Sequence, residues 1–246
     1  MTRGLLALVV SLTVLAGCGD APATGGPSAD DPTGSPPSSF AFGRCPSDAP
    51  ALEAARPVAE ADLDGDGTAA SIGLVPPSVG GPCANALIAE SGREVSGVPL
   101  GETVLDPGAA DVVQLQGTPR QLVVVRGEAH PRGGFSLHLY GDDEGRLGEI
   151  LEDGEPFLDF VASDGGAAPA TVSCTEDGGI ATVTTFTHKP PGIVLAWDVT
   201  TTNYQLTGTR ARVVSTSTER GIADPTLQQQ MPALFDPEAY FVDCIV

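Results

Sequence analysis

Basic residues are scarce in this chain, and their scarcity excludes several classes of partner. There is one lysine, Lys189, and the formal net charge is -20 at pH 7. So acidic a surface is repelled by the phosphates of nucleic acids and by anionic lipid headgroups. We therefore expect no nucleic-acid partner, whereas cations and basic partners remain compatible with the charge.

Recognisable catalytic motifs are also missing. The sequence contains no Gly-x-Ser-x-Gly, no His-Glu-x-x-His and no phosphate-binding glycine loop. Of the three histidines, His130, His138 and His188, we expect the first to lie in a solvent-exposed loop. His138 shares the polar face of an expected strand with Ser136 and Tyr140. A hydrolytic group can be built from such residues, but a surface histidine is the commoner case. No catalytic residue is predicted.

Long apolar runs are absent apart from one at the N-terminus. Arg3 is followed by an uncharged, mostly apolar stretch from Gly4 to Gly19. The stretch is shorter than the roughly 20 residues of a membrane-spanning helix, and a basic start before a short apolar run is typical of a secretory signal.

The apolar run ends in Leu15-Ala16-Gly17-Cys18, which resembles the lipobox of bacterial lipoproteins. The resemblance implies a signal peptide over residues 1–17, cleavage after Gly17, and lipid such as palmitate on Cys18. A diacylglyceryl group supplies two chains, enough for stable anchoring at the outer face of the cytoplasmic membrane. An ordinary signal peptide with a chance cysteine is the alternative.

Residues 18–44 are rich in Gly, Pro, Ser, Ala, Thr and Asp, with no large apolar side chain before Phe40. Such a segment cannot bury enough surface to offset its ordering entropy, so we expect a disordered tether. Residues 45–246 are long enough for one domain with a sizeable core.

Strand signals dominate this domain. Residues 134–140 and 193–199 alternate apolar with polar side chains, and Leu122–Val125 is an apolar run typical of a strand buried on both faces. Further strands are expected at residues 71–75, 111–115, 157–162, 170–174, 180–188, 203–206 and 210–217. Helical turns are expected over residues 51–56 and 224–231, the latter with Asp224 as N-cap and Pro225 at N1. The fold class is therefore all-β, with many short antiparallel strands in a propeller-like or sandwich arrangement and one or two short helices.

One segment has the pattern of a metal-binding loop. Asp62, Asp64 and Asp66 occupy positions 1, 3 and 5, Gly67 allows a sharp turn, and Thr68 can offer its carbonyl. Calcium prefers six to eight oxygen ligands, and the bidentate Glu of an EF-hand at position 12 is replaced here by Gly73. We expect a weak calcium site, with a plain acidic turn as the alternative.

The same loop, followed by the apolar Ile72-Gly73-Leu74-Val75, resembles the calcium loops of FG-GAP and VCBS-type repeats. In those loops the ninth position is acidic, and here it is Ala70. The resemblance covers residues 62–75 in a single copy and implies a β context with a degenerate calcium site. As a whole the chain resembles actinobacterial lipoproteins that carry a lone loop of this kind.

Four cysteines remain beside Cys18, and in an exported domain they favour two disulfides over a zinc site. We predict Cys45 with Cys83 and Cys174 with Cys244, because each bridge then ties one end of the domain to its interior. Pairing of Cys45 with Cys244 is the strongest alternative, since domain termini often lie close together.

These features predict a membrane-anchored, surface-exposed lipoprotein with a non-catalytic binding or interaction role that calcium modulates. Its expected partners are the bacterial membrane, through the lipid on Cys18, and a protein or glycan ligand. The alternative function is a cell-envelope hydrolase acting on glycans with carboxylates from distant loops.

Overall fold

The computed structural model describes residues 50–79, 83–92, 94–100, 110–129, 135–158, 161–162, 168–188, 195–236, 239–241 and 243–244. The chain divides into two units, Met1–Ser39 and Phe40–Val246, and every described residue belongs to the second. The predicted signal peptide, Cys18, the whole predicted tether, Cys45 and His130 lie outside the described residues. Within the described part of the chain, no helix is long and apolar enough to cross a membrane.

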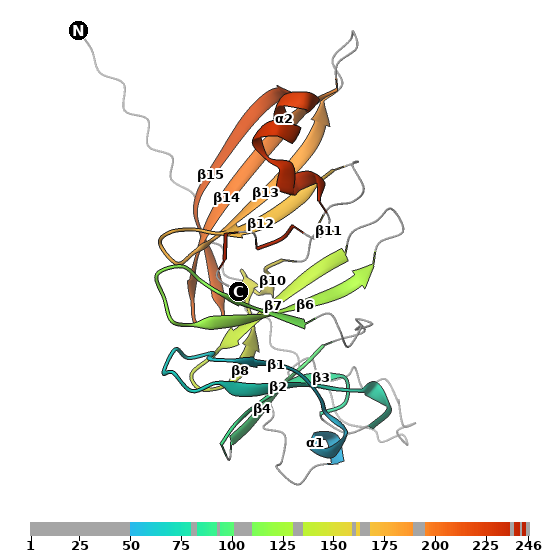
Figure 1. Ribbon diagram of the computed structural model, residues 1–246, viewed down its shortest axis with the longest axis vertical. Helices are drawn as coiled ribbons and strands as arrows, with labels where there is room; N and C mark the ends of the chain where they lie inside the picture. The colour runs from blue at the N-terminus through green and yellow to red at the C-terminus, as the bar shows by residue number, and fades with distance from the viewer. Residues whose placement is uncertain are drawn as a thin grey trace, which may run out of the picture. The chain divides into compact units, whose positions relative to one another are not determined.

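The described residues form three sheets whose strand pairs are antiparallel, apart from one parallel contact between Arg210 and Leu151 (Figure 1). The first sheet is a meander in chain order: β1 (Arg56–Ala61), β2 (Ala70–Val75), β3 (Ala86–Ser91) and β4 (Glu94–Pro99). Of its four strands only β2 was expected, because the alanine-rich and proline-containing sequences of the others carry weak strand signals.

The second sheet has the order β11-β7-β6-β5, and β8 also pairs with β7. Its strands are β5 (Ala110–Gln114), β6 (Gln121–Ala129), β7 (Phe135–Asp142), β8 (Leu147–Glu149) and β11 (Val161–Ala162). The third sheet has the order β10-β9-β15-β14-β13-β12. Its strands are β9 (Leu151–Glu152), β10 (Glu155–Pro156), β12 (Ala170–Cys174), β13 (Ile180–His188), β14 (Ala196–Thr207) and β15 (Arg210–Ala223).

The second sheet lies between the other two, and β6 shows why. Leu122 and Val124 pack in a cluster with Val172 and Ile180 of the third sheet. Val123 and Val125 join a separate cluster with residues of the first sheet, such as Ile72. Alternate residues of a strand point to opposite faces, so β6 is buried on both, as its unbroken apolar run predicts.

The helices cover outer faces of the sheets. The helix α1 (Pro50–Ala54) packs against Val75 and Ile88. The helix α2 (Asp224–Gln230) and the 3-10 turn η2 (Pro232–Phe235) cover Trp197 and Val199. A second 3-10 turn, η1, spans Pro77–Val79. The prediction of an all-β domain with one or two short helices is confirmed, and face-to-face packing of its sheets agrees with the sandwich alternative.

Several expected boundaries are wrong. Phe157 and Leu158 form a turn rather than the start of a strand, because their side chains are drawn into the core between the second and third sheets. The strands expected at residues 193–199 and 203–206 are one continuous strand, β14. Asp224 is the first residue of α2 rather than its N-cap, a position that Ala223 takes.

A disulfide joins Cys174 at the end of β12 to Cys244, with Cα atoms 5.0 Å apart. This is the predicted pairing of these two residues. Cys83 is also disulfide-bonded. Its expected partner Cys45 lies outside the described residues, so that pairing stays a prediction.

Candidate functional site

The acidic loop between β1 and β2 is held in shape by its own carboxylates. Asp62 accepts a hydrogen bond from Gly65 N on one oxygen and from Gly67 N on the other, both at 2.9 Å. Asp64 accepts one from Asp66 N at 3.1 Å. These short-range bonds give the backbone a series of tight turns. Gly67 has φ of +89°, so it provides the sharp turn predicted from its position.

The loop is anchored to the start of β6. Asp62 N donates to Gln121 Oε1 at 2.7 Å, and Gln121 N donates to Asp62 O at 2.8 Å. The Arg120 guanidinium donates to the carbonyl of Leu63 at 3.5 Å and to that of Asp142 at 3.4 Å. A single arginine therefore ties the acidic loop to the turn between β7 and β8.

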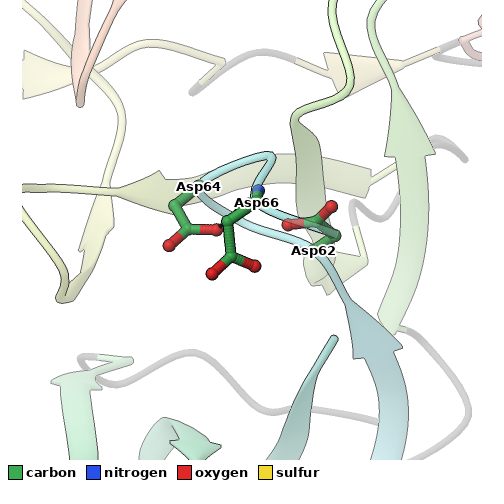
Figure 2. Close-up of side chains that lie close together, drawn as sticks. All are labelled: Asp62, Asp64 and Asp66. Carbon is green, nitrogen blue, oxygen red and sulfur yellow. Dashed lines mark hydrogen bonds between the residues drawn. The ribbon is translucent and has the colours of Figure 1, made fainter. Parts of the chain in front are cut away.

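The structure brings together the three predicted carboxylates. Asp62, Asp64 and Asp66 each offer a ligand oxygen within 4.8 Å of the others, and Figure 2 shows their side chains gathered at one short loop. Asp62 is half-buried and the other two are exposed. Thr68, the fourth predicted ligand, donates its backbone N–H to Asp66 Oδ1 at 2.7 Å.

The loop forms one wall of a pocket of about 170 Å³. Asp64, Asp66 and Thr68 line this pocket together with Asp142 and Arg146 from the turn between β7 and β8. Hydroxyl groups and small apolar side chains complete its lining: Ser91, Ser96, Ala70, Ala89, Val95 and Leu147. The pocket is thus acidic and hydroxyl-rich, with a partly apolar wall.

The three gathered carboxylates match the chemistry of a hard cation, since calcium is bound by oxygen ligands. They fall short of the six to eight oxygens of a full calcium shell, so water would have to complete the coordination. The arrangement fits a weak calcium site of the predicted kind, and a tight one would need ligands from outside the loop.

His138 is more enclosed than expected. Its side chain is 17% exposed, and its Nδ1 lies 2.8 Å from Oε1 of Glu149 on β8. The pKa of the adjacent Tyr140 is raised, first because its hydroxyl is buried and second because of the negative charge of Glu149. The sequence did not single out Glu149, because it comes from a three-residue strand beyond a turn.

Acidic side chains also shape two of the described turns. Asp142 Oδ1 accepts a hydrogen bond from Gly145 N at 2.8 Å. Asp177 sits in the turn between β12 and β13, where a hydrogen bond from the Thr175 hydroxyl lowers the pKa of its carboxyl.

A polar cluster around Tyr240 was not predicted. The Tyr240 hydroxyl donates to Asp111 Oδ2 at 2.8 Å and accepts from Arg126, whose guanidinium also stacks over the Phe135 ring, 4.7 Å from its centroid. These residues are far apart in the sequence, so no local pattern reveals them.

Comparison with known protein families, with curated proteins and with solved structures finds no match to this chain.

Proposed function

We propose that this chain is a lipoprotein, anchored through Cys18 to the outer face of the bacterial cytoplasmic membrane, whose domain binds a partner there. The lipobox-like segment Leu15-Ala16-Gly17-Cys18 and the short apolar run before it support this export and membrane anchoring. The Gly/Pro/Ser-rich segment that follows would set the domain away from the bilayer.

The observation that carries the binding role is the pocket beside the acidic loop. Its lining combines carboxylates with hydroxyls, the groups that contact a cation or the hydroxyls of a glycan. Asp64 and Asp66 both line this pocket and belong to the candidate calcium site. A bound calcium ion would neutralise part of the negative charge at the pocket wall and hold the two carboxylates in place. Calcium would in this way modulate what the pocket accepts.

Calorimetric titration of the purified chain with calcium tests the proposal. We expect a dissociation constant on the order of 10⁻⁴–10⁻³ M, the range of extracellular calcium modules, because the loop supplies few ligands. The double variant Asp64→Asn, Asp66→Asn should abolish the binding, whereas Asp153→Asn, in an exposed turn, should leave it unchanged.

Magnesium should bind more weakly, because it prefers near-ideal octahedral geometry and loses its water reluctantly. Submicromolar calcium affinity would contradict a degenerate loop. Absence of binding at millimolar calcium would show that the three carboxylates serve only to shape the turn.

A further inference from the structure

Ser136 and His138 lie two residues apart on β7, so their side chains share one face of the strand. That face is the one on which Tyr140 packs with the first sheet. The strand β8 pairs with β7 and places Glu149 opposite Tyr140, beside these two residues. A hydroxyl, an imidazole and a carboxylate thus meet on one surface of the second sheet.

The three groups are arranged in series. His138 Nδ1 is engaged by Glu149 Oε1 at 2.8 Å. Its other ring nitrogen, Nε2, lies 3.0 Å from the point that a Cβ on Gly127 would occupy, and Ser136 Oγ lies 2.2 Å from that same point. The carboxylate therefore binds one side of the ring, and the serine hydroxyl lies near the other.

Gly127 makes this approach possible, because any side chain there would overlap the serine hydroxyl. The strand pairing is also irregular at this place. Arg126 pairs with Leu137 and Ala129 pairs with Phe135, so two residues of β6 oppose the single Ser136. Such a β-bulge redirects side chains and is over-represented next to active sites.

We propose that Ser136, His138 and Glu149 form a hydrolytic triad that cleaves short-chain carboxylic esters. Ser136 is the nucleophile, His138 the general base and Glu149 the group that orients the imidazole. This proposal goes beyond the binding role. The alternative function expected from the sequence was a hydrolase that uses carboxylates from distant loops. The hydrolase proposed here uses a serine nucleophile instead.

The hydrogen bond to Glu149 sets the tautomer of His138. An ionised carboxylate only accepts, so Nδ1 carries the proton and Nε2 keeps its lone pair for the serine. No hydrogen bond joins Ser136 Oγ to Nε2 in the described structure. In free enzymes this contact is often long and tightens only when substrate binds.

The reaction has two steps. Ser136 Oγ attacks the ester carbonyl while its proton passes to His138 Nε2; the ester C–O bond breaks, and the alcohol leaves with that proton. Water then attacks the acyl-serine and gives a proton to Nε2, the acyl–Oγ bond breaks, and Oγ regains the proton as the acid leaves. Glu149 stabilises the imidazolium that forms in each step.

The burial of the triad limits the substrate. Ser136 is 8% exposed. The side chains of His138 and Glu149 are 17% and 22% exposed. Only a slim acyl group can reach so enclosed a hydroxyl, so we expect acetyl and similar short acyl esters. The negative charge of the protein disfavours anionic substrates and leaves neutral or cationic esters.

A fluorophosphonate probe tests the nucleophile directly, because it forms a covalent bond with an activated serine. The full-length chain is incubated with the probe without added calcium, and the labelled peptide is identified by mass spectrometry. We expect label on Ser136. The variant Ser136→Ala should lose it, and Ser71→Ala, an exposed serine of β2, should keep it.

Hydrolysis of p-nitrophenyl acetate measures the other two roles. We expect Ser136→Ala to reduce the rate to that of buffer. His138→Ala should lower kcat/KM about 100-fold or more, the usual contribution of general-base catalysis. Glu149→Gln, which keeps the size of the side chain but removes its charge, should lower kcat and leave KM nearly unchanged.

Ser136→Ala removes a single oxygen, so this variant keeps the fold, which a thermal melt would verify. Gly127→Ala should also block labelling, because its methyl group would occupy the space of the hydroxyl. The proposal is overturned if the probe labels no serine, if it labels a serine other than Ser136, or if Ser136→Ala hydrolyses the ester at the rate of the unchanged chain. The hydrogen bond between His138 and Glu149 would then have only the structural role of linking β7 to β8.

Discussion

Tyr240 shows how one residue can connect segments that are distant in the sequence. Its ring stacks edge-to-face on Phe135, with centroids 5.6 Å apart. Its hydroxyl lies between the carboxylate of Asp111 and the guanidinium of Arg126. Burial is the main reason that the pKa of Tyr240 is raised to about 12, and its hydrogen bond to Asp111 adds to the rise.

This shift predicts how stability depends on alkaline pH. A tyrosine in the unfolded chain loses its proton near pH 10, about two pH units before Tyr240 does in the folded protein. The free energy of unfolding should therefore fall as the pH rises from about 10 and level off above the folded pKa. Urea unfolding at successive pH values would measure this decline.

The variant Tyr240→Phe removes this contribution, so its stability should fall less steeply between pH 10 and 12. Tyr140, whose pKa is also raised, should maintain part of the decline in the variant. Equal slopes for the two proteins would mean that the Tyr240 hydroxyl is as free to ionise in the folded chain as in the unfolded one.

At the scale of single residues, local patterns were predicted from the sequence, whereas long-range contacts other than the pairing of Cys174 with Cys244 were not. The spacing of Asp62, Asp64 and Asp66 is a property of one turn, so it was visible. Glu149 reaches its partners through strand pairing, and Tyr240 lies in a segment held by the Cys174–Cys244 bridge and by hydrogen bonds with Thr171 and Val172. Neither residue stands out among its neighbours in the sequence.

Among the elements, α2 depends on a contact that its sequence does not suggest. Asp224 was expected to cap the helix through its side chain. Instead, Asp224 Oδ1 accepts a hydrogen bond from Trp197 Nε1 at 2.7 Å, and Oδ2 accepts one from Gln228 at 2.9 Å. The carboxylate thus fastens α2 to β14, and Leu227, fully buried, packs beside the tryptophan.

The variant Asp224→Ala should loosen this attachment. Without the carboxylate, the Trp197 N–H has no acceptor, and Trp197 is only 1% exposed. Because a buried donor is left unsatisfied, we expect the free energy of unfolding to fall by about 1–3 kcal/mol. Trp197 is the only tryptophan of the chain, so its fluorescence reports on this site alone. We expect the emission to shift to longer wavelength.

Gln228→Ala is the matched control, since it removes only the exposed partner of the same carboxylate. Its emission and unfolding midpoint should remain close to those of the unchanged chain. An unshifted spectrum for Asp224→Ala would show that the packing of Leu227, rather than the hydrogen bond, fixes the helix.

The strands of the first sheet were the least predictable elements. In β3, Leu87 packs toward the second sheet whereas Ile88 packs toward α1. Its sequence, Ala-Leu-Ile-Ala-Glu-Ser, contains good helix formers, and it becomes a strand because β2 and β4 pair on either side of it. Tertiary pairing overrides local preference here, and one sequence does not display that pairing.

At the scale of the whole molecule, the bridge between Cys174 and Cys244 closes a loop of 70 residues. In the chain-entropy model a loop of this size stabilises the fold by about 4 kcal/mol, comparable to several core contacts. Gln116, Thr171 and Val172 also bind the segment that carries Cys244, through hydrogen bonds to or from its backbone. This segment therefore closes the space between the second and third sheets.

The lipid anchor is the prediction that concerns the whole chain. In a bacterial host, replacing Cys18 with Ser should release the protein from the membrane fraction, because two acyl chains supply the stable attachment. Metabolic labelling with a palmitate analogue should mark the unchanged chain and the control Ser35→Ala, but not Cys18→Ser. A Cys18→Ser protein that stays in the membrane fraction and carries label would contradict the lipobox interpretation.

The position of the second sheet also bears on how the sequence can vary. Leu122 to Val125 have no face toward solvent, so a change in size at any of them disturbs one of two separate cores. Residues 212–220 of β15, by contrast, are all exposed. Over evolutionary time, substitutions should accumulate in β15, whereas β6 should accept little beyond exchanges among Val, Ile and Leu.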